Sequence, residues 1–462
     1  MTFILRPRQT ELLNDVRSHI AEGKKRILIQ APTGFGKTVL AAKIMEGAAQ
    51  KGNRAFFIVH RRELIRQSYQ TLAQSSDISM GVVAAGFPDK RHNQTQICSI
   101  QTLGNRMHLI PPPALVLWDE SHHIAAASYR RVFAEYPDAV HIGLTATPRR
   151  LDGQGLSDFF DVMVLGPSIA TLIAEGWLSD YALYAPSHAD LTGVRSLGGD
   201  YHKGDLDAAM RGSSVTGDAV REYRRHADRK RAIAFVWSIE ASIDMARRFN
   251  EAGVPAEHVD GTTDELVRDA AMQRFIAGET LVLCNVDLYS EGVDVPAVEC
   301  IIMLQPTKSL TRYMQQIGRS LRVQAGKDRA IILDHAGNSE QHGLPDDERE
   351  WALEGVKKKA KKAEAPGIKM CPECQRYVQS VARQCRYCGF RFVVQFRDID
   401  EVEGELAPVD IEQVRRNRKA EIWEAKTEAD LHALAKARGY KHGWVKHIMQ
   451  SREKKRMGSQ ND

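Results

Sequence analysis

Runs of apolar residues alternate with longer stretches of helical periodicity over most of this 462-residue chain. In the first half, the apolar runs occupy residues 26–30, 55–60, 96–100, 115–119 and 141–145. Segments such as 38–50 and 62–74 lie between them and read as helices. Strands that are buried on both faces form continuous apolar runs, and the intervening helices cover those faces. The pattern therefore predicts an α/β domain built on a parallel sheet.

The same pattern begins again in the second half of the chain. Further apolar runs occupy residues 231–237, 256–261, 280–286, 299–304 and 330–334. Helical stretches such as 239–253 and 309–322 separate these runs. We therefore expect a fold of two tandem α/β domains with parallel sheets.

Changes in composition suggest where the parts of the chain meet. Residues 186–215 are polar and rich in glycine, which favours a connection with little core of its own. We expect a first domain over 1–185, this connection over 186–215, a second domain over 216–350, a charged linker over 351–369, a cysteine module over 370–392 and a basic helical tail over 410–462.

Composition excludes some classes of protein. Apolar residues make up 43% of the chain, charged residues make up 27%, and no apolar stretch approaches the roughly 20 residues that span a bilayer. The first ten residues do not resemble a signal peptide. We therefore expect a cytoplasmic protein with no membrane partner.

Positive charge is concentrated at the C-terminal end. The formal net charge of the chain is +5, but residues 415–462 contain thirteen Lys or Arg against six Asp or Glu. This surplus favours a polyanionic partner for the tail, with a solvated basic tail as the simpler alternative.

The stretch "QAPTGFGKT" (30–38) has the form of a phosphate-binding loop. The strict pattern is G-x-x-x-x-G-K-[ST], and here Ala31 replaces the first glycine. Backbone N–H groups of such a loop, with the N-terminus of the next helix, hold phosphate oxygens. Lys37 would contact the β- and γ-phosphates, and Thr38 would ligate Mg²⁺. A purely structural glycine turn is the alternative. The other residues expected to contact nucleotide in this loop are Thr33, Gly34 and Gly36.

Two adjacent acids supply the rest of a hydrolytic site. "LVLWDESHH" (115–123) is a strand that ends at Asp119 and Glu120. Hydrolysis of a metal triphosphate needs one carboxylate to hold Mg²⁺ and a second group to position the attacking water. We assign the first role to Asp119 and the second to Glu120.

With these residues, the chain resembles the superfamily 2 helicases of DEAD/DEAH form. The motifs of that superfamily follow in order as "LRPRQ" (5–9), "VHRRELIRQ" (59–67), "SIQTL" (99–103), "DESH" (119–122), "LTATPRR" (144–150), "AFVWSIEAS" (234–242), "VDLYSEGVDVP" (286–296) and "QQIGRSLR" (315–322). The resemblance covers about residues 3 to 340. Within the superfamily, the chain looks most like RadD-type proteins and the translocase subunits of restriction enzymes.

The resemblance implies two RecA-like domains with ATP in the cleft between them. Gln9, with Arg6 beside it, is in the position that recognises adenine. Arg319 and Arg322 lie three apart, so both fall on one face of a helix. From there an arginine can stabilise charge that develops on the γ-phosphate. Gly292 and Asp294 would contribute to the same cleft by analogy.

The resemblance also implies a nucleic-acid path across both domains. Arg61, Gln101 and Thr102 would contact the backbone of one strand, which positions nucleic acid without reading its sequence. Thr145 and Thr147 would couple this surface to the ATP cleft, together with Gln315. For the threonines, β-propensity alone is the alternative explanation.

Four of the seven cysteines form a C-x₂-C-x₁₀-C-x₂-C pattern. Two such pairs of thiolates complete a tetrahedral Zn²⁺ site, and a site closed by four protein ligands is structural. The expected ligands are Cys371, Cys374, Cys385 and Cys388. Two disulfides are the alternative, which a reducing cytoplasm disfavours. The basic and aromatic residues nearby suit nucleic acid, protein contacts or solubility equally.

These features together predict an ATP-dependent helicase or translocase that uses ATP, Mg²⁺ and Zn²⁺. Its substrate would be nucleic acid, with DNA preferred to RNA, in repair, recombination or replication. The alternatives are an RNA-remodelling helicase and an ATP-switched clamp that recruits a repair or replication protein without unwinding.

Overall fold

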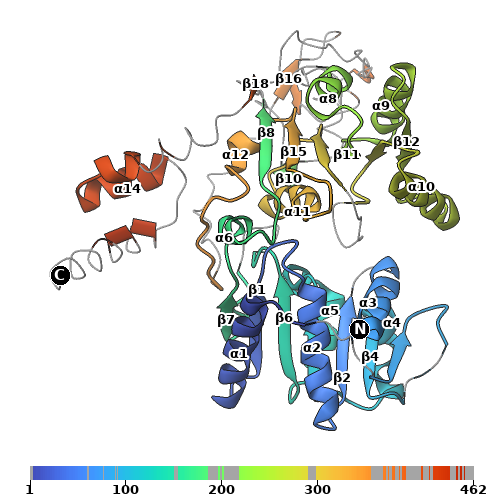
Figure 1. Cartoon of the computed structure of the whole chain (residues 1–462), viewed down its shortest axis with the longest axis vertical. Helices are drawn as coiled ribbons and strands as arrows, with labels where there is room; N and C mark the ends of the chain where they lie inside the picture. The colour runs from blue at the N-terminus through green and yellow to red at the C-terminus, as the bar shows by residue number, and fades with distance from the viewer. Residues whose placement is uncertain are drawn as a thin grey trace.

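Two seven-stranded sheets organise the chain, one above the other in Figure 1. The computed structural model describes residues 4–59, 62–75, 78–88, 90, 92–149, 155–185, 218–289 and 298–354, with short pieces at 196–197 and 200–201 and from 368 onward. Among these residues no helix is both long enough and apolar enough to cross a membrane. The predicted pair of parallel-sheet α/β domains is confirmed.

The first sheet has the strand order β3-β4-β2-β5-β6-β1-β7, and every pairing in it is parallel. Its strands are β1 (Arg26–Gln30), β2 (Ala55–Val59), β3 (Met80–Val83), β4 (Thr95–Ser99), β5 (Leu115–Trp118), β6 (Val140–Thr145) and β7 (Val162–Leu165). Its helices are α1 (Pro7–Ala21), α2 (Lys37–Gln50), α3 (Arg62–Ser75), α4 (Ile100–Arg106) and α5 (Ala127–Glu135), with the short 3₁₀ turns η1 (Met107–Leu109) and η2 (Ser121–His123). All five residues of β2 are buried, as a central parallel strand requires.

The second sheet has the order β12-β13-β11-β14-β15-β8-β18 and is parallel except at β18. Its strands are β8 (Tyr181–Ala185), β11 (Ala232–Phe235), β12 (Ala256–Val259), β13 (Val282–Asn285), β14 (Cys300–Met303), β15 (Ala330–Asp334) and β18 (Ala407–Pro408). The helices of this half are α8 (Ala219–Ala227), α9 (Ile239–Glu251), α10 (Glu265–Ala277), α11 (Leu310–Ser320) and α12 (Asn338–His342).

Strand β8 corrects the predicted domain boundary. The sequence pattern places residues 1–185 in the first domain, but β8 is hydrogen-bonded to β15 in the second sheet. The reason is long-range pairing, since β15 lies about 150 residues further along the chain and no pattern within β8 itself indicates this partner. Helix α6 (Ile169–Ala174) and the turn after it therefore carry the chain from one sheet to the other.

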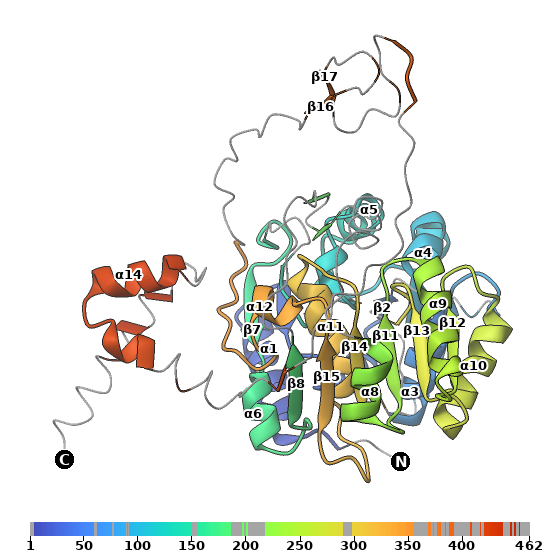
Figure 2. The ribbon, with the colours of Figure 1, turned by 90° about the horizontal axis from the view of Figure 1, so that it is seen from above.

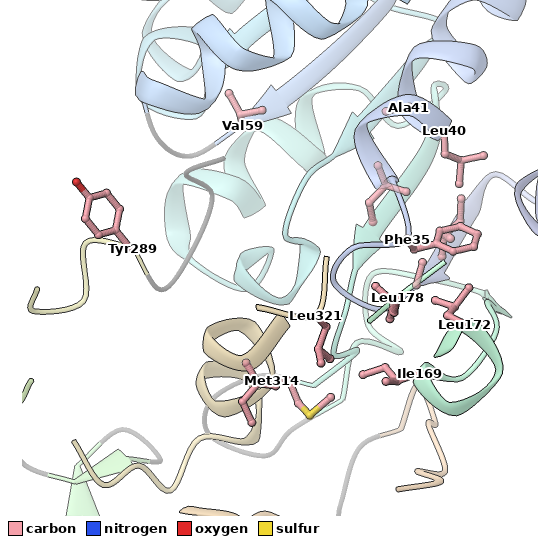
Figure 3. Close-up of a cluster of buried hydrophobic side chains, with 14 of the residues drawn as sticks. Phe35, Leu40, Ala41, Val59, Ile169, Leu172, Leu178, Tyr289, Met314 and Leu321 are labelled. Carbon is pink, nitrogen blue, oxygen red and sulfur yellow. The ribbon is translucent and has the colours of Figure 1, made fainter. Parts of the chain in front are cut away.

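The two domains share apolar packing. One cluster of buried side chains includes Phe35 of the first domain, Ile169 of α6, Leu178, and Met314 and Leu321 in or beside α11 (Figure 3). A backbone hydrogen bond adds to this packing, in which the Ser179 N–H donates to the Leu321 carbonyl at 2.7 Å. Helix α11 is therefore held at the interface between the domains.

The chain returns to the first domain after α12. The Leu353 carbonyl accepts hydrogen bonds from the backbone N–H groups of Leu156 at 2.6 Å and Ser157 at 3.0 Å, and its side chain packs on the first domain's core. Upstream, Arg349 donates to four backbone carbonyls between His342 and Asp347, and Tyr181 donates to Asp346. Residues 343–353, hereafter the strap, are thus bonded to both domains.

Smaller elements complete the described chain. They are the pairs β9 (Ser196–Leu197) with β10 (Asp200–Tyr201) and β16 (Ile368–Met370) with β17 (Tyr377–Gln379), and helix α14 (Glu428–Ala437). Figures 1 and 2 both draw α14 apart from the two sheets. A separate apolar cluster that includes Leu431, Ala435 and Val445 packs there.

A buried histidine links β5 and β6 inside the first domain. The Trp118 indole N–H donates to His141 Nδ1 at 3.1 Å, so the neutral ring carries its proton on Nε2 and donates to the Tyr136 carbonyl at 2.8 Å. Protonation would place a second N–H against the indole donor. Burial lowers the pKa of His141 from 6.5 to about 4.

This histidine should make the first domain sensitive to acid. Between pH 6.5 and about 4 the unfolded chain binds a proton at position 141 that the folded chain does not. The free energy of unfolding should therefore fall as pH drops through this window, by about 1.4 kcal/mol per pH unit. Glutamine could keep both hydrogen bonds without titrating, so His141→Gln should lose this part of the pH dependence.

Urea unfolding at pH 7 and pH 5, followed by tryptophan fluorescence, measures the difference between wild type and variant. His108→Gln, at an exposed position, is the matched control. An identical pH dependence in wild type and His141→Gln would contradict the assignment.

Candidate functional site

Three neighbouring strands of the first sheet end at one edge and deliver the candidate residues there. β5, β6 and β1 are adjacent and parallel, so the segments that follow them meet. These are the glycine-rich loop after β1, Asp119 and Glu120 after β5, and Thr145 at the end of β6. The carboxyl edge of a parallel sheet is where open α/β proteins bind ligands.

The glycine-rich loop needs its glycines. Gly34 and Gly36 have φ of +87° and +91°, the left-handed region that side chains rarely adopt. A Cβ at Gly36 would lie 2.6 Å from Gln9 Nε2. The Gln9 amide in turn donates to the Phe35 carbonyl at 2.8 Å and accepts from the Arg6 N–H at 2.9 Å. Gln9, which is predicted to recognise adenine, therefore lies against the loop, and Arg6 contacts Gln9.

Lys37 begins α2 directly after this loop, and Thr38 follows it. The Lys37 side chain is partly buried, but its ammonium group lies deep enough for loss of water to lower its pKa. Glu120 and Asp119 oppose that shift, whereas Arg319 and Arg322 reinforce it. The ammonium group donates to the Ala31 carbonyl at 3.3 Å. Five charged groups from two domains therefore act on one another here.

The turn after β5 is strained and tightly held. Glu120 has φ of +46°, uncommon for a residue with a side chain, and is largely buried. The next residue, Ser121, directs its hydroxyl at the carbonyls of Trp118 at 2.9 Å and Leu144 at 3.1 Å. Ser121 replaces the alanine of the helicase motif, and its hydroxyl ties this turn to β6.

Helix α11 of the second domain closes the site. A Cβ at Gly318 would lie 2.5 Å from the Thr33 Cβ, so the helix contacts the glycine-rich loop at this point. Arg319 is buried, and burial lowers the pKa of the Arg322 guanidinium. The Arg322 backbone also accepts a hydrogen bond from the Ser179 hydroxyl at 3.2 Å. Backbone contacts thus fix the C-terminal end of α11, where Arg319 lies, and the segment after it that carries Arg322.

The charges fit an anionic ligand. Lys37, Arg319 and Arg322 outnumber Asp119 and Glu120, and removing unbalanced charge from water is costly. Gln315 lies one turn before Arg319, is 2% exposed, and has neither amide atom hydrogen-bonded within the described structure. A ligand with several negative oxygens would balance the surplus charge and could accept a hydrogen bond from the Gln315 amide nitrogen. These residues therefore fit the phosphates of a nucleotide.

One further contact at this site has no local sequence signal. The Arg6 guanidinium lies 4.5 Å from the centre of the Trp177 ring. Such an arrangement is a cation–π contact, which holds the planar guanidinium in one orientation. Trp177 is about 170 residues away in sequence and belongs to no motif, so only the fold reveals it.

The predicted nucleic-acid residues are only partly described. Gln101 and Thr102 lie in the first turn of α4, where Gln101 is exposed and its side-chain oxygen accepts from the Ser99 hydroxyl at 2.9 Å. They stand at the same edge of the sheet as the charged cluster, beyond β2. Arg61 lies outside the described residues, as do Gly292 and Asp294, which were predicted for the ATP cleft. All five assignments stay predictions.

The cysteine module is also partly described. Cys388 is exposed, and Cys371, Cys374 and Cys385 lie outside the described residues. Within the described part of the chain, no group of three or more His, Cys, Asp or Glu side chains is arranged to hold a metal ion. The zinc site therefore stays a prediction.

Comparison with known families agrees with the motif order. Residues 2–150 match the family described as "Type III restriction enzyme, res subunit", and residues 216–324 match "Helicase conserved C-terminal domain". A "51.5 kDa protein" of a Lactococcus phage is 37% identical over 391 residues, which cover 84% of this chain and 83% of the phage protein. Saccharomyces cerevisiae "Putative ATP-dependent helicase IRC3" is 29% identical over 73% of this chain and only 52% of the yeast protein.

Solved structures show the same fold. The restriction-modification enzyme LlaBIII, solved bound to DNA, matches 72% of this chain and 28% of its own with a TM-score of 0.53 at 17% identity. A type I restriction HsdR fragment from Vibrio vulnificus matches 74% of this chain and 66% of its own with a TM-score of 0.59 at 20% identity. Together the matched families, the relatives and the shared fold show that the chain belongs to the ATP-hydrolysing superfamily 2 helicases, of the restriction-enzyme translocase type.

Proposed function

We propose that this protein couples hydrolysis of Mg-ATP between its two domains to movement on, or remodelling of, DNA. The observation that carries the proposal is the meeting of Lys37, Asp119 and Glu120 with Arg319 and Arg322. The two carboxylates of the first domain and the two arginines of the second all act on Lys37 beside the glycine-rich loop. Such a site is complete only when the domains are together, so hydrolysis can be linked to a change in domain position.

The first domain would bind the phosphates. Backbone N–H groups of residues 34–38 and the N-terminus of α2 favour negative oxygens. The Lys37 ammonium, which donates to the Ala31 carbonyl at 3.3 Å, would turn to the β- and γ-phosphates. Thr38 and Asp119 have the oxygen ligands that would hold Mg²⁺, which when bound neutralises phosphate charge.

The remaining residues would act on the attacking water and the departing phosphate. Glu120, held in its strained turn, would orient the water and accept its proton. Arg319 and Arg322 would stabilise negative charge that develops during transfer. Because Arg319 lies in α11 and Arg322 follows just after it, the contact of α11 with the loop at Gly318 sets how well they are aligned.

Nucleic acid would lie along the carboxyl edge of the first sheet, by Gln101 and Thr102. The DNA preference is supported by relatives of the type I restriction class and by a 23% identical relative named "DNA 3'-5' translocase XPB2" from Sulfurisphaera tokodaii. Work in repair, recombination or replication is part of the same proposal. RNA is the second candidate, since a 26% identical segment belongs to "ATP-dependent RNA helicase DBP4" of Cryptococcus neoformans.

The first prediction of the proposed function concerns Glu120, the expected proton acceptor. Glu120→Gln keeps the size of the side chain and removes its ability to accept a proton, so kcat for ATP should fall by at least about 100-fold. Nucleotide affinity should change little, because the loop and Lys37 are untouched. Steady-state phosphate release and binding of a fluorescent ATP analogue measure the two effects. Glu135→Gln, at an exposed position on α5, is the control and should behave as wild type.

The second prediction concerns the polymer. ATPase rates should rise with single-stranded, duplex or forked DNA and rise less with RNA. Equal, low rates with every polymer would favour the clamp that recruits a partner. Stimulation by RNA alone would favour the RNA-remodelling alternative.

The third prediction concerns domain closure. Gly318→Ala adds a methyl group 2.5 Å from the Thr33 Cβ, which must push α11 away from the loop. Overpacking of about 1–3 kcal/mol predicts that kcat falls by about 10- to 100-fold. Gly47→Ala in α2 is the matched control, because its Cβ would meet nothing within 4 Å and alanine favours helices. Full activity in Gly318→Ala would show that hydrolysis does not need this contact.

The fourth prediction concerns the cysteine module, for which we propose a structural Zn²⁺ site. Purified protein should hold one zinc ion per chain, and Cys371→Ser with Cys385→Ser should remove it. Cys98→Ala is the control, because burial raises the pKa of the Cys98 thiol and keeps it from acting as a thiolate ligand. Absence of zinc, with only three of the seven cysteines reactive in denatured protein, would indicate disulfides instead.

A further inference from the structure

One hydrogen bond between two buried threonines joins the domains. The Thr147 hydroxyl, in the turn after β6, donates to the Thr311 hydroxyl at 2.8 Å. Thr147 is 1% exposed and Thr311 is 4% exposed. Thr147 belongs to the first domain, whereas Thr311 lies in the first turn of α11. Losing either hydroxyl would leave the other short of a partner in a site that water does not reach.

On the first-domain side, further contacts lead from Thr147 to the turn that holds Glu120. Thr145 Oγ1 donates to the Thr147 carbonyl at 3.1 Å and accepts from the Thr147 N–H at 3.2 Å. His122 Nδ1 lies 3.3 Å from Thr145 Oγ1 and 3.3 Å from Glu120 Oε2. The first contact is a hydrogen bond between His122 and Thr145, and the second places the His122 ring within ion-pair distance of the Glu120 carboxylate.

On the second-domain side, the bond is made by the helix that carries the arginines. Thr311, Gln315 and Arg319 are spaced by four residues, so they share one face of α11. A rotation or slide of α11 that breaks the bond at Thr311 would also displace Arg319, because a helix moves as a rigid rod over two turns. The Thr147–Thr311 hydrogen bond therefore depends on the same position of α11 that places Arg319.

We propose that Thr311 is a positioning residue that sets the register of α11 against the first domain. Through Thr147, Thr145 and His122, its hydroxyl connects α11 to the turn that holds Glu120. The arginines then face the phosphate loop in the same arrangement in which Glu120 is oriented for its role. This inference rests on the proposed ATP hydrolysis and adds a residue that lies in no nucleotide-binding motif.

The alternative is that Thr311 only fills space, and substitutions separate the two roles. Thr311→Val keeps the shape and removes the hydroxyl, whereas Thr311→Ser keeps the hydroxyl and removes a methyl group. If the hydroxyl positions α11, Thr311→Val should lower kcat for ATP about tenfold, with little change in KM. Thr311→Ser should retain most of the wild-type kcat.

A double-mutant cycle tests the partner. Thr147→Val should lower kcat by a similar factor, and Thr147→Val with Thr311→Val should be no slower than either single variant, since one bond is lost in all three. Thr95→Val is the matched control. Thr95 is fully buried in β4, and its hydroxyl has no hydrogen-bond partner within the described structure, so kcat should not change.

The outcomes distinguish this inference from the function on which it rests. Absence of ATPase activity in wild-type protein would overturn the proposed function. Active wild type with a fully active Thr311→Val would overturn only the positioning role. So would equal losses in Thr311→Val and Thr311→Ser, or a double variant whose loss equals the product of the single losses. Thermal unfolding of each variant identifies any that fails to fold, and the serine variant then carries the test.

Discussion

The contact of α11 with the glycine-rich loop is the constraint on which the site depends. At Gly318 the backbone of α11 lies so close to the Thr33 side chain that even a Cβ would not fit between them. That approach brings two guanidinium groups toward a lysine that already lacks water, a repulsive arrangement in isolation. Apolar packing around Leu178 and Leu321 opposes the repulsion. The interface therefore combines an attraction that is always present with a repulsion that an anion removes.

This balance explains how ligand and domain position can be coupled. Without anion, separation of the domains relieves like charges, whereas bound phosphates turn the same charges into an attraction. A ligand shifts such an equilibrium only by its difference in affinity for the two states. Under the proposed function the difference would come from Arg319 and Arg322, because they reach the site only when the domains are together. The same side chains would then serve both domain closure and catalysis.

What could be predicted from sequence follows from the range of each interaction. The loop before Lys37 and the acids at 119 and 120 can be recognised in the sequence because a strand, a turn and the candidate residue are contiguous. The central strands of both sheets are visible because burial on two faces makes them continuously apolar. β8 was assigned to the wrong domain because its pairing with β15 is distant. Trp177 and Thr311 were missed for the same reason, since neither has a local pattern that marks its partner.

The strap limits how far the two domains can separate. Asp346 accepts a hydrogen bond from Tyr181, the first residue of β8 in the second sheet, and the Leu353 carbonyl accepts hydrogen bonds from the first domain. Six residues lie between these anchors, and the seven residue steps from Asp346 to Leu353 span at most about 25 Å when fully extended. While both anchors hold, the strap is a tether of fixed maximum length on the opening of the domains. After Leu353 the chain leaves from the first domain, and β18 then pairs with β8 in the second sheet. The cysteine module therefore lies in a segment anchored to both domains, and the tail leaves from the second.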